Sequence, residues 1–211
     1  MGKIYPNDPR FGEQWSLDNT GQFGGKPGID INSLAAWSIA NRSPNVIVAV
    51  IDTGIQLDHP DLKDNIWINQ DEIPGNNNDD DNNGYIDDIN GWSFKNNSPD
   101  PLIDENTPIS HGTHVAGIIG ATGNNGIGIT GVTWDVQIMP IDTASVMFTS
   151  KNNGKTEYPE NDPFVPAIKY AVDNGASIIH LSQGAIFKGL GQSNNNFKGQ
   201  SYNDWKKEYP V

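Results

Sequence analysis

The longest apolar run of the chain covers residues 46–51, and no polar residue interrupts it. Most of its residues are β-branched, and a strand that is buried on both faces of a parallel sheet has this pattern. Asp52 follows the run directly, ahead of Thr53 and Gly54. The run therefore predicts a central strand with a carboxylate at its carboxyl end, where the reactive crevice of an open α/β sheet lies. An Asp before such a glycine is also a common turn residue, so this segment alone leaves both interpretations open.

Apolar residues with helical spacing precede the central strand. We predict a helix over residues 31–40, because Asp30 has the residue type of an N-cap and apolar residues then recur every three or four positions. The expected apolar face consists of Ile31, Leu34, Ala35 and Ile39.

Two further helices and two further strands are predicted after it. Small and apolar residues over 110–121 indicate a helix that packs against the sheet, and residues 136–141 and 177–182 have the composition of core strands. The last helix is expected to begin with Asp162 as N-cap and Pro163 at its first position, and to end at Gly175. Its expected apolar stripe is Val165, Ile168, Ala171 and Val172. Strand, helix and strand with short connections indicate a parallel sheet with right-handed crossovers.

The rest of the chain has no such periodicity. Residues 69–88 are almost all Asn, Asp and Gly and are predicted to form a loop, and residues 143–161 are predicted to be a polar insertion. After residue 185 only residues 202–209 have the pattern of a short helix.

Composition limits the class of protein and its partners. A chain of 211 residues is expected to fold as a single domain, residues 1–211. The formal net charge of −13 argues against a nucleic-acid partner and suits divalent cations, although a solvated acidic surface explains any single Asp equally well. Without cysteine, neither disulfides nor thiolate–zinc sites can form. No apolar run is long enough to span a membrane, and the first residues lack a signal peptide, so the chain is either cytosolic or begins after processing.

The loop over residues 69–88 contains the beginning of an oxygen-ligand calcium motif. Carboxylate and amide side chains alternate, a glycine follows, and then a main-chain carbonyl and an acid occupy the next ligand positions. The residues in these positions are Asp79, Asp81, Asn83, Gly84, Tyr85 and Asp87. Asn90 stands where an EF-hand has Glu, so an EF-hand is not supported. We favour a calcium loop over a solvated acidic loop.

A second motif, His-Gly-Thr-His-Val-Ala-Gly, covers residues 111–117. Together with Asp52-Thr53-Gly54 it closely resembles the subtilisin-like serine proteases, the subtilase family. The resemblance implies an α/β, three-layer fold with a central parallel sheet flanked by helices. Residues 1–184 would be the family-like core and 185–211 a divergent tail, so that the domain is incomplete at its C-terminus, with about its amino-terminal two-thirds present.

The resemblance also implies roles for individual residues. Asp52 would orient the imidazole of His111, and His111 would act as the base toward a serine nucleophile; the alternative for His111 is a core histidine. His114 is expected to be buried. Ser182, Gln183 and Gly184 match the strand that pairs with an extended peptide substrate.

A calcium site near the N-terminus is implied in the same way. Its ligands would be three side chains and three main-chain carbonyls, a donor set that suits Ca²⁺. The side chains are those of Asp8, Asp61 and Asn125, and the carbonyls those of Thr122, Ile127 and Ile129. The alternative is an ordinary Asn-Gly turn. Both calcium ions would be structural.

The chain departs from the family in its nucleophile. It contains no Gly-Thr-Ser motif, and none of its predicted strands ends in the small-residue run with Gly-Asn that supplies the oxyanion donor in the family. The resemblance implies a secreted, monomeric serine endopeptidase; its serine would lie outside these residues, so we expect no activity from the chain alone. The alternative is a calcium-stabilised peptide-binding relative that has lost catalysis. An aspartic protease, which also carries Asp-Thr-Gly, is disfavoured because it needs two such carboxylates on hairpin loops.

Overall fold

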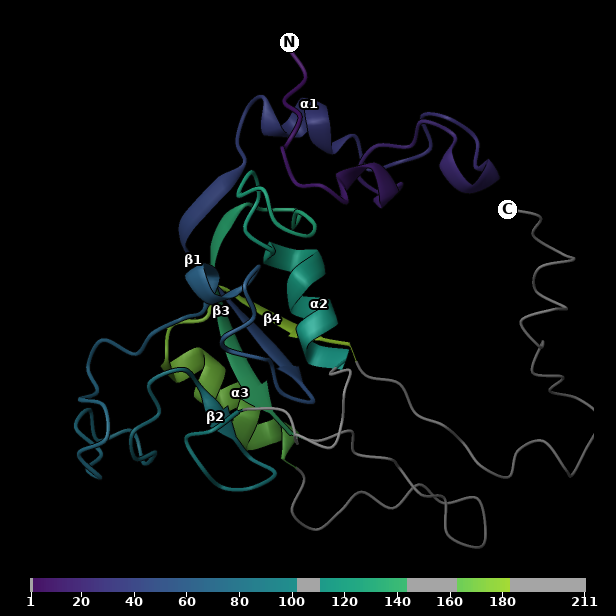
Figure 1. Ribbon diagram of the computed structural model, residues 1–211. Helices are drawn as coiled ribbons and strands as arrows, with labels where there is room; N and C mark the ends of the chain where they lie inside the picture. The colour runs from purple at the N-terminus through teal and green to yellow at the C-terminus, as the bar shows by residue number, and fades with distance from the viewer. Residues whose placement is uncertain (1, 102–110, 144–162, 183–211) are drawn as a thin grey trace, which may run out of the picture. The chain divides into compact units, whose positions relative to one another are not determined.

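The computed structural model describes residues 2–101, 111–143 and 163–182 (Figure 1). All of them belong to one compact unit, which comprises residues 1–145 and 163–183. In chain order, the elements in this part of the chain are the short 3-10 helices Phe11–Glu13 and Gln22–Gly24, helix α1 (Ser33–Trp37), strand β1 (Arg42–Asp52), the 3-10 helix Lys63–Asn65, strand β2 (Trp92–Ser93), helix α2 (His111–Gly120), strand β3 (Asp135–Asp142), helix α3 (Phe164–Asp173) and strand β4 (Ile178–Leu181). The predictions for residues 144–161, for 202–209 and for the tail 185–211 lie outside the described residues.

The four strands form one parallel sheet in the order β2-β3-β1-β4. The central position of β1 confirms the interpretation of its apolar run. Its last residue, Asp52, pairs with Asp142 of β3, which also pairs with Ser93 of β2. The carboxyl ends of three strands therefore meet at one edge of the sheet, and Asp52 lies there. This arrangement confirms the predicted α/β class.

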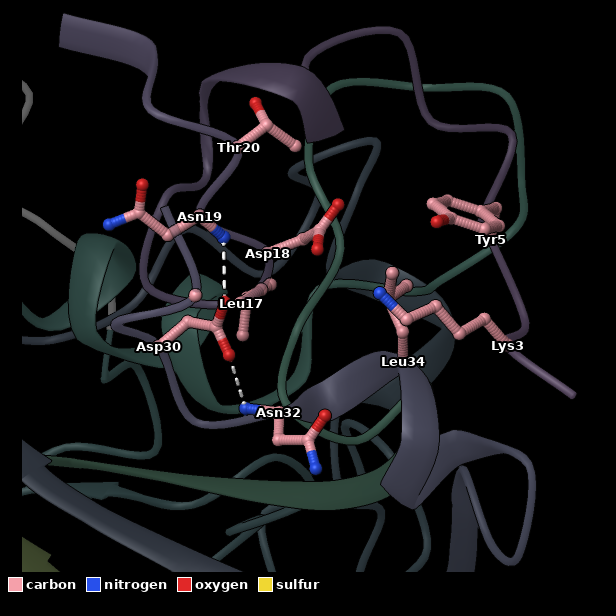
Figure 2. Close-up of a pocket in the computed structure, with 10 residues that line it drawn as sticks. Lys3, Tyr5, Leu17, Asp18, Asn19, Thr20, Asp30, Asn32 and Leu34 are labelled. Atoms are coloured by element: carbon pink, nitrogen blue, oxygen red, sulfur yellow. Dashed lines mark hydrogen bonds between the residues drawn. The ribbon is translucent and has the colours of Figure 1, made fainter. Parts of the chain in front are cut away.

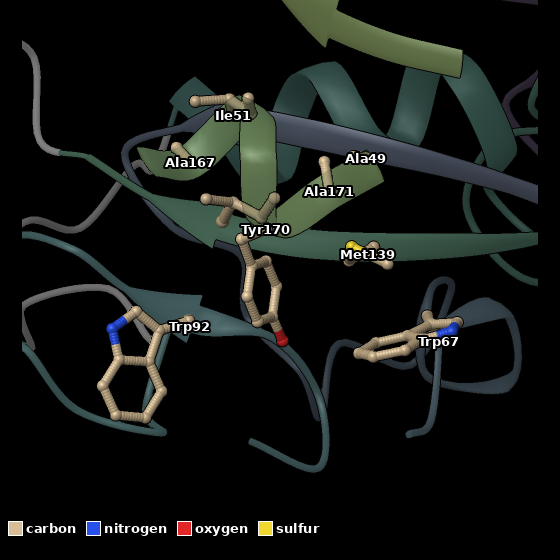
Figure 3. Packing of buried hydrophobic residues seen from close by; sticks show 9 residues of the cluster. Ala49, Ile51, Trp67, Trp92, Met139, Ala167, Tyr170 and Ala171 are labelled. Carbon is tan, nitrogen blue, oxygen red and sulfur yellow. The ribbon is translucent and has the colours of Figure 1, made fainter. Parts of the chain in front are cut away.

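Alternate residues of β1 face opposite layers, which explains why its apolar run does not alternate with polar residues. Ala49 and Ile51 belong to a buried cluster with Tyr170 of α3 (Figure 3). Val48 and Val50 pack instead in a cluster that contains Val115 and Ala116 of α2. Burial of each Val or Ile side chain contributes about 1.5–3 kcal/mol of transfer free energy. Helices α2 and α3 thus cover opposite faces of the sheet.

The first predicted helix is correct in place but wrong in extent and in its cap. Helix α1 has only five residues, and Asn32 rather than Asp30 stands at its N-cap. Asp30 instead accepts hydrogen bonds from the main-chain N–H groups of Asn19 and Asn32. Ile31 and Ile39 are exposed, because Ile31 precedes the helix and Ile39 follows it, so neither joins the face that buries Leu34.

The position of α3 is confirmed, but of its predicted apolar stripe only Ala171 is buried; Val165, Ile168 and Val172 are exposed. The buried residues are Ala167, Tyr170 and Ala171, whereas Val165 is 70% and Val172 58% exposed. The three buried residues lie three and four positions apart and so form one face of the helix, which packs on the sheet through two small side chains and one large ring. The helix begins at Phe164, with Pro163 in the cap position; Asp162 lies outside the described residues. Gly175 adopts φ +78°, as predicted for the left-handed residue that ends the helix.

Candidate active site and cation sites

Asp52 and His111 are in direct contact at the carboxyl edge of the sheet. Nδ1 of His111, the first residue of α2, lies 2.9 Å from both Oδ1 and Oδ2 of Asp52. An ionised carboxylate only accepts hydrogen bonds, so Nδ1 carries the proton and donates it. Asp52 is 1% exposed, whereas the His111 side chain is 56% exposed. The carboxylate therefore fixes the imidazole from the buried side and leaves Nε2 as the nitrogen that is free to accept a proton.

The residues next to this pair explain how it is held. Thr53 donates to Oδ1 of Asp52 from its main-chain N–H, at 2.7 Å, and from its hydroxyl, at 3.1 Å. The same hydroxyl accepts a hydrogen bond from the N–H of Gly112 at 3.2 Å. A Cβ atom on Gly112 would lie 2.4 Å from the carbonyl oxygen of Gly54, so only glycine allows α2 to begin this close to β1. Sequence and geometry thus agree on why Asp-Thr-Gly and His-Gly occur together.

Other residues of the predicted active site lie as follows. His114 is not buried, so the prediction of burial is wrong: it lies three residues along α2 from His111 and keeps part of its surface in contact with solvent. Ser182 directly follows the edge strand β4 and is exposed. Gln183 and Gly184 lie outside the described residues.

The structure brings the predicted ligands of the N-terminal cation site together. The Asn125 amide donates to Oδ1 of Asp61, and the N–H of Ile129 donates to Oδ2. Asp8 reaches the same loop, because its Oδ2 accepts the N–H of Asn124 at 2.7 Å. The N–H of Thr122 donates to the carbonyl oxygen of Asp61 and so joins the loop after α2 to the turn at residues 59–61. Segments far apart in the sequence therefore meet around two carboxylates.

Two buried oxygen atoms at this site have no hydrogen-bond partner among the described residues: Oδ1 of Asp8 and Oγ1 of Thr122. Asp8 is only 4% exposed, and its burial raises the pKa of the carboxyl despite the main-chain N–H groups that lower it. An orphaned buried carboxylate oxygen costs free energy unless a cation or a donor meets it. The residues present therefore fit a hard cation such as Ca²⁺.

The loop over residues 69–88, hereafter the acidic loop, gathers three carboxylates. Oxygen atoms of Glu72, Asp81 and Asp88 lie within 4.8 Å of one another. Asp88 is fully buried, and this burial raises the pKa of its carboxyl. Asn69 and Asn83 donate amide N–H groups to both Asp81 and Asp88. The donor set is rich in oxygen and suits a hard divalent cation.

Two other carboxylates predicted as ligands, those of Asp79 and Asp87, accept main-chain hydrogen bonds within the loop. Asp79 accepts the N–H groups of Asn83 and Gly84. Asp87 adopts φ +55°, and its carboxylate accepts the N–H groups of residues 76 and 77. Glu72 and Asp88, which complete the cluster, were missed by sequence analysis. The fixed ligand spacing that we used cannot reach Glu72, and Asp88 was passed over for its neighbour.

A cavity of about 490 Å³ lies in the N-terminal part of the chain, away from these residues. Figure 2 shows Asp30 on its wall between Asn19 and Asn32. Both oxygens of Asp30 accept main-chain N–H groups, and these hydrogen bonds lower the pKa of the carboxyl. Asp30 therefore holds two turns together, and we assign this cavity no part in the chemistry below.

Comparisons with known proteins were made with the site in view. The family model described as the subtilase family matches residues 43–209. Subtilisin-like protease 1 of Plasmodium berghei is 44% identical over 131 residues, which are 62% of this chain and 20% of that protein. The cell wall-associated protease of Bacillus subtilis is 31% identical over 184 residues, or 86% of this chain and 17% of that protein. The chain thus spans about a fifth or less of the length of these relatives.

The structural comparison points the same way. A crystal structure of the Aeromonas sobria serine protease in complex with a chaperone matches with a TM-score of 0.58 at 26% identity, over 86% of this chain and 26% of that one. Within the described residues, no helix has the length and hydropathy that crossing a membrane requires.

Proposed function

Because this chain belongs to the subtilase family of serine endopeptidases, we propose that Asp52 and His111 form the acid–base part of a peptide-hydrolysing triad. The observation that carries this proposal is the double contact of His111 Nδ1 with the buried Asp52 carboxylate. Asp52 holds the tautomer in which Nε2 accepts the proton of a serine hydroxyl, and its charge stabilises the imidazolium that results. His111 then returns the proton to the leaving amine.

The nucleophile is proposed to come from chain beyond these residues, since the sequence contains no Gly-Thr-Ser motif. An acid–base pair with neither nucleophile nor oxyanion donor forms no acyl-enzyme. The 211 residues by themselves are therefore expected to hydrolyse no peptide. Ser182, with Gln183 and Gly184, is proposed to bind the main chain of an extended peptide or protein substrate as an added strand.

Structural calcium is proposed at two sites. The N-terminal site would use Asp8, Asp61 and Asn125 with the carbonyls of residues 122, 127 and 129, and the acidic loop would use Glu72, Asp81 and Asp88. Bound Ca²⁺ supplies positive charge to carboxylates that otherwise face one another. Such oxygen sites fill where calcium is abundant, so we further propose that the protein is secreted.

The test begins with the gene. Reading the coding DNA past the codon for Val211 should show an in-frame continuation with Gly-Asn and Gly-Thr-Ser. The protein encoded by the longer reading frame should hydrolyse fluorogenic casein. In that protein, Asp52→Asn or His111→Ala should lower kcat by a factor on the order of 10⁴–10⁶. A stop codon after Val211, or an active His111→Ala variant, would refute the proposal. A stop codon would favour the alternative, a non-catalytic peptide-binding protein, and the chain should then bind extended peptides by itself.

A further inference from the structure

Tyr170 is a buried residue whose hydroxyl lies outside the apolar part of the core. The residue belongs to α3 and is 1% exposed, and its ring packs against Ala49, Met139 and Ile141 of the sheet. Figure 3 shows the ring extending away from the helix, with its hydroxyl between Trp67 and Trp92. Such a hydroxyl needs a partner, because burying it without one is costly.

That partner is Asp88 of the acidic loop. The Tyr170 hydroxyl donates to Oδ2 of Asp88 at 2.5 Å, a charge-assisted hydrogen bond between two side chains that are both buried. The same oxygen accepts an amide N–H from Asn83, and Oδ1 accepts one from Asn69. Asp88 is therefore oriented jointly by α3 and by the acidic loop.

Aromatic contacts join the same two segments a second time. The Tyr85 ring of the acidic loop meets the Tyr170 ring edge-to-face, with centroids 4.9 Å apart. Tyr85 also meets Trp92 of β2 at 5.0 Å, and Phe94 meets Tyr170 at 6.0 Å. Tyr85 is thus the centre of an aromatic cluster that includes Tyr170, so the acidic loop and α3 share one packed group of rings.

We propose that Tyr170 is a positioning residue that couples cation binding in the acidic loop to helix α3 and strand β4. The inference rests on the proposed calcium site in that loop. A cation bound by Glu72, Asp81 and Asp88 would hold the Asp88 carboxylate in place, so that its hydrogen bond with the Tyr170 hydroxyl requires less ordering of the Asp88 side chain. Coupling of this kind is reciprocal, so the hydroxyl strengthens cation binding by the same factor.

The path beyond α3 is short. Helix α3 ends at Asp173, and the chain turns at Gly175. The N–H of Ser177 then donates to the carbonyl oxygen of Ile47, and β4 pairs with β1 directly afterwards. Ser182, the proposed substrate contact, is the next residue after β4. A cation in the acidic loop therefore stabilises the strand that leads into the proposed substrate site.

Hydrogen exchange of the whole chain, followed by mass spectrometry during a calcium titration, tests the coupling. In the wild type, amides of residues 69–88 and of residues 164–173 should become protected at the same calcium midpoint. Tyr170→Phe should raise the midpoint for residues 69–88 by about 10–100-fold, as loss of a partner to a metal ligand generally does, and should uncouple residues 164–173. The midpoint for residues 122–130, at the other calcium site, should stay unchanged.

Ser33→Ala is the matched control, because it also removes a buried hydroxyl donor, to the carbonyl oxygen of Leu17, but far from the acidic loop. It should leave all midpoints as in the wild type. If calcium protects residues 69–88 but not 164–173, or if Tyr170→Phe titrates like the wild type, the coupling is wrong and the calcium site stands. If calcium leaves residues 69–88 unprotected, both fail. Should Tyr170→Phe not fold, the shared or separate midpoints of the wild type decide.

Discussion

Replacing Gly112 with alanine should separate His111 from Asp52. The new Cβ would lie 2.4 Å from the carbonyl oxygen of Gly54 and 3.1 Å from Cβ of Asp52. Neither neighbour is the flexible end of a side chain, so the start of α2 must move outward by roughly 1 Å to reach ordinary van der Waals contact. His111 adjoins Gly112, and such a shift takes its Nδ1 beyond hydrogen-bond distance of the carboxylate.

The expected cost combines two terms. Overpacking at a buried position costs about 1–3 kcal/mol, and the lost hydrogen bond to a charged group costs about 1.5–3 kcal/mol. We take the lower end of the second range, since the His111 side chain is 56% exposed and water replaces part of the interaction. Alanine regains up to about 1 kcal/mol of helix propensity. The free energy of unfolding should therefore fall by about 2–4 kcal/mol.

Urea unfolding of calcium-loaded chain measures this loss, and NMR of the imidazole ring reports the contact. The chain has only 4 histidines, so the His111 resonances can be assigned by substitution. Gly117→Ala is the control in the same helix: its Cβ would meet only Cδ1 of Ile129, at 3.7 Å. That variant should match or exceed wild-type stability and keep the His111 resonances. A Gly112→Ala chain of wild-type stability with unshifted His111 resonances would refute the geometric reasoning.

Three further predictions follow from the same structure. Removing calcium should lower the free energy of unfolding by about 2–5 kcal/mol, because Asp8 and Thr122 keep buried orphan oxygens, and Asp8→Asn should abolish most of the N-terminal site's share of this effect. Burial raises the pKa of the Asp8 and Asp88 carboxyls, so the calcium-free folded state holds protons that the unfolded state releases. The stabilisation that these two protonated carboxyls give the calcium-free fold is thus full below the usual Asp pKa near 4, and it is lost as pH rises through the raised pKa values. Urea midpoints measured across this pH range, in the wild type and in Asp8→Asn, test this pH dependence. Finally, Val165→Lys with Val172→Lys should change stability by less than about 0.5 kcal/mol and reduce light scattering by the chain, since both side chains are exposed; a large loss of stability would contradict their placement.

The sheet was predictable from sequence because burial on both faces leaves an uninterrupted apolar run. The packing faces of the helices were not. In α3 the apolar residues Val165 and Val172 were assigned to the core, yet Ala167 and Tyr170 occupy it beside Ala171, because residues with these spacings share one helical face and the two valines lie outside it. Strand β2 is two residues long, too short for any period to show.

The candidate sites were also predictable only in part. Asp52 and His111 could be found because their local motifs encode the geometry directly: Thr53 caps the carboxylate, and glycine admits the helix. The acidic loop could be identified as a ligand-rich segment, but not its ligands. Asp87 and Asp88 are adjacent and identical, yet the Asp87 carboxylate accepts the N–H groups of residues 76 and 77, whereas the Asp88 carboxylate is fully buried in the cluster. Spacing along a sequence carries no information on that choice.

The two proposed cation sites give the acidic composition a structural meaning. Two Ca²⁺ ions would reduce the negative charge of a chain of formal net charge −13, and they would do so where carboxylates are buried rather than at the surface. One proposed site lies in the loop that follows α2, whose first residue is the proposed base His111; the other contacts α3, which leads into β4 and Ser182. Each proposed ion thus adjoins a ten-residue helix that is connected to a different part of the proposed chemistry. Loss of calcium should therefore impair catalytic geometry and substrate binding through separate helices, with effects that add if α2 and α3 respond independently.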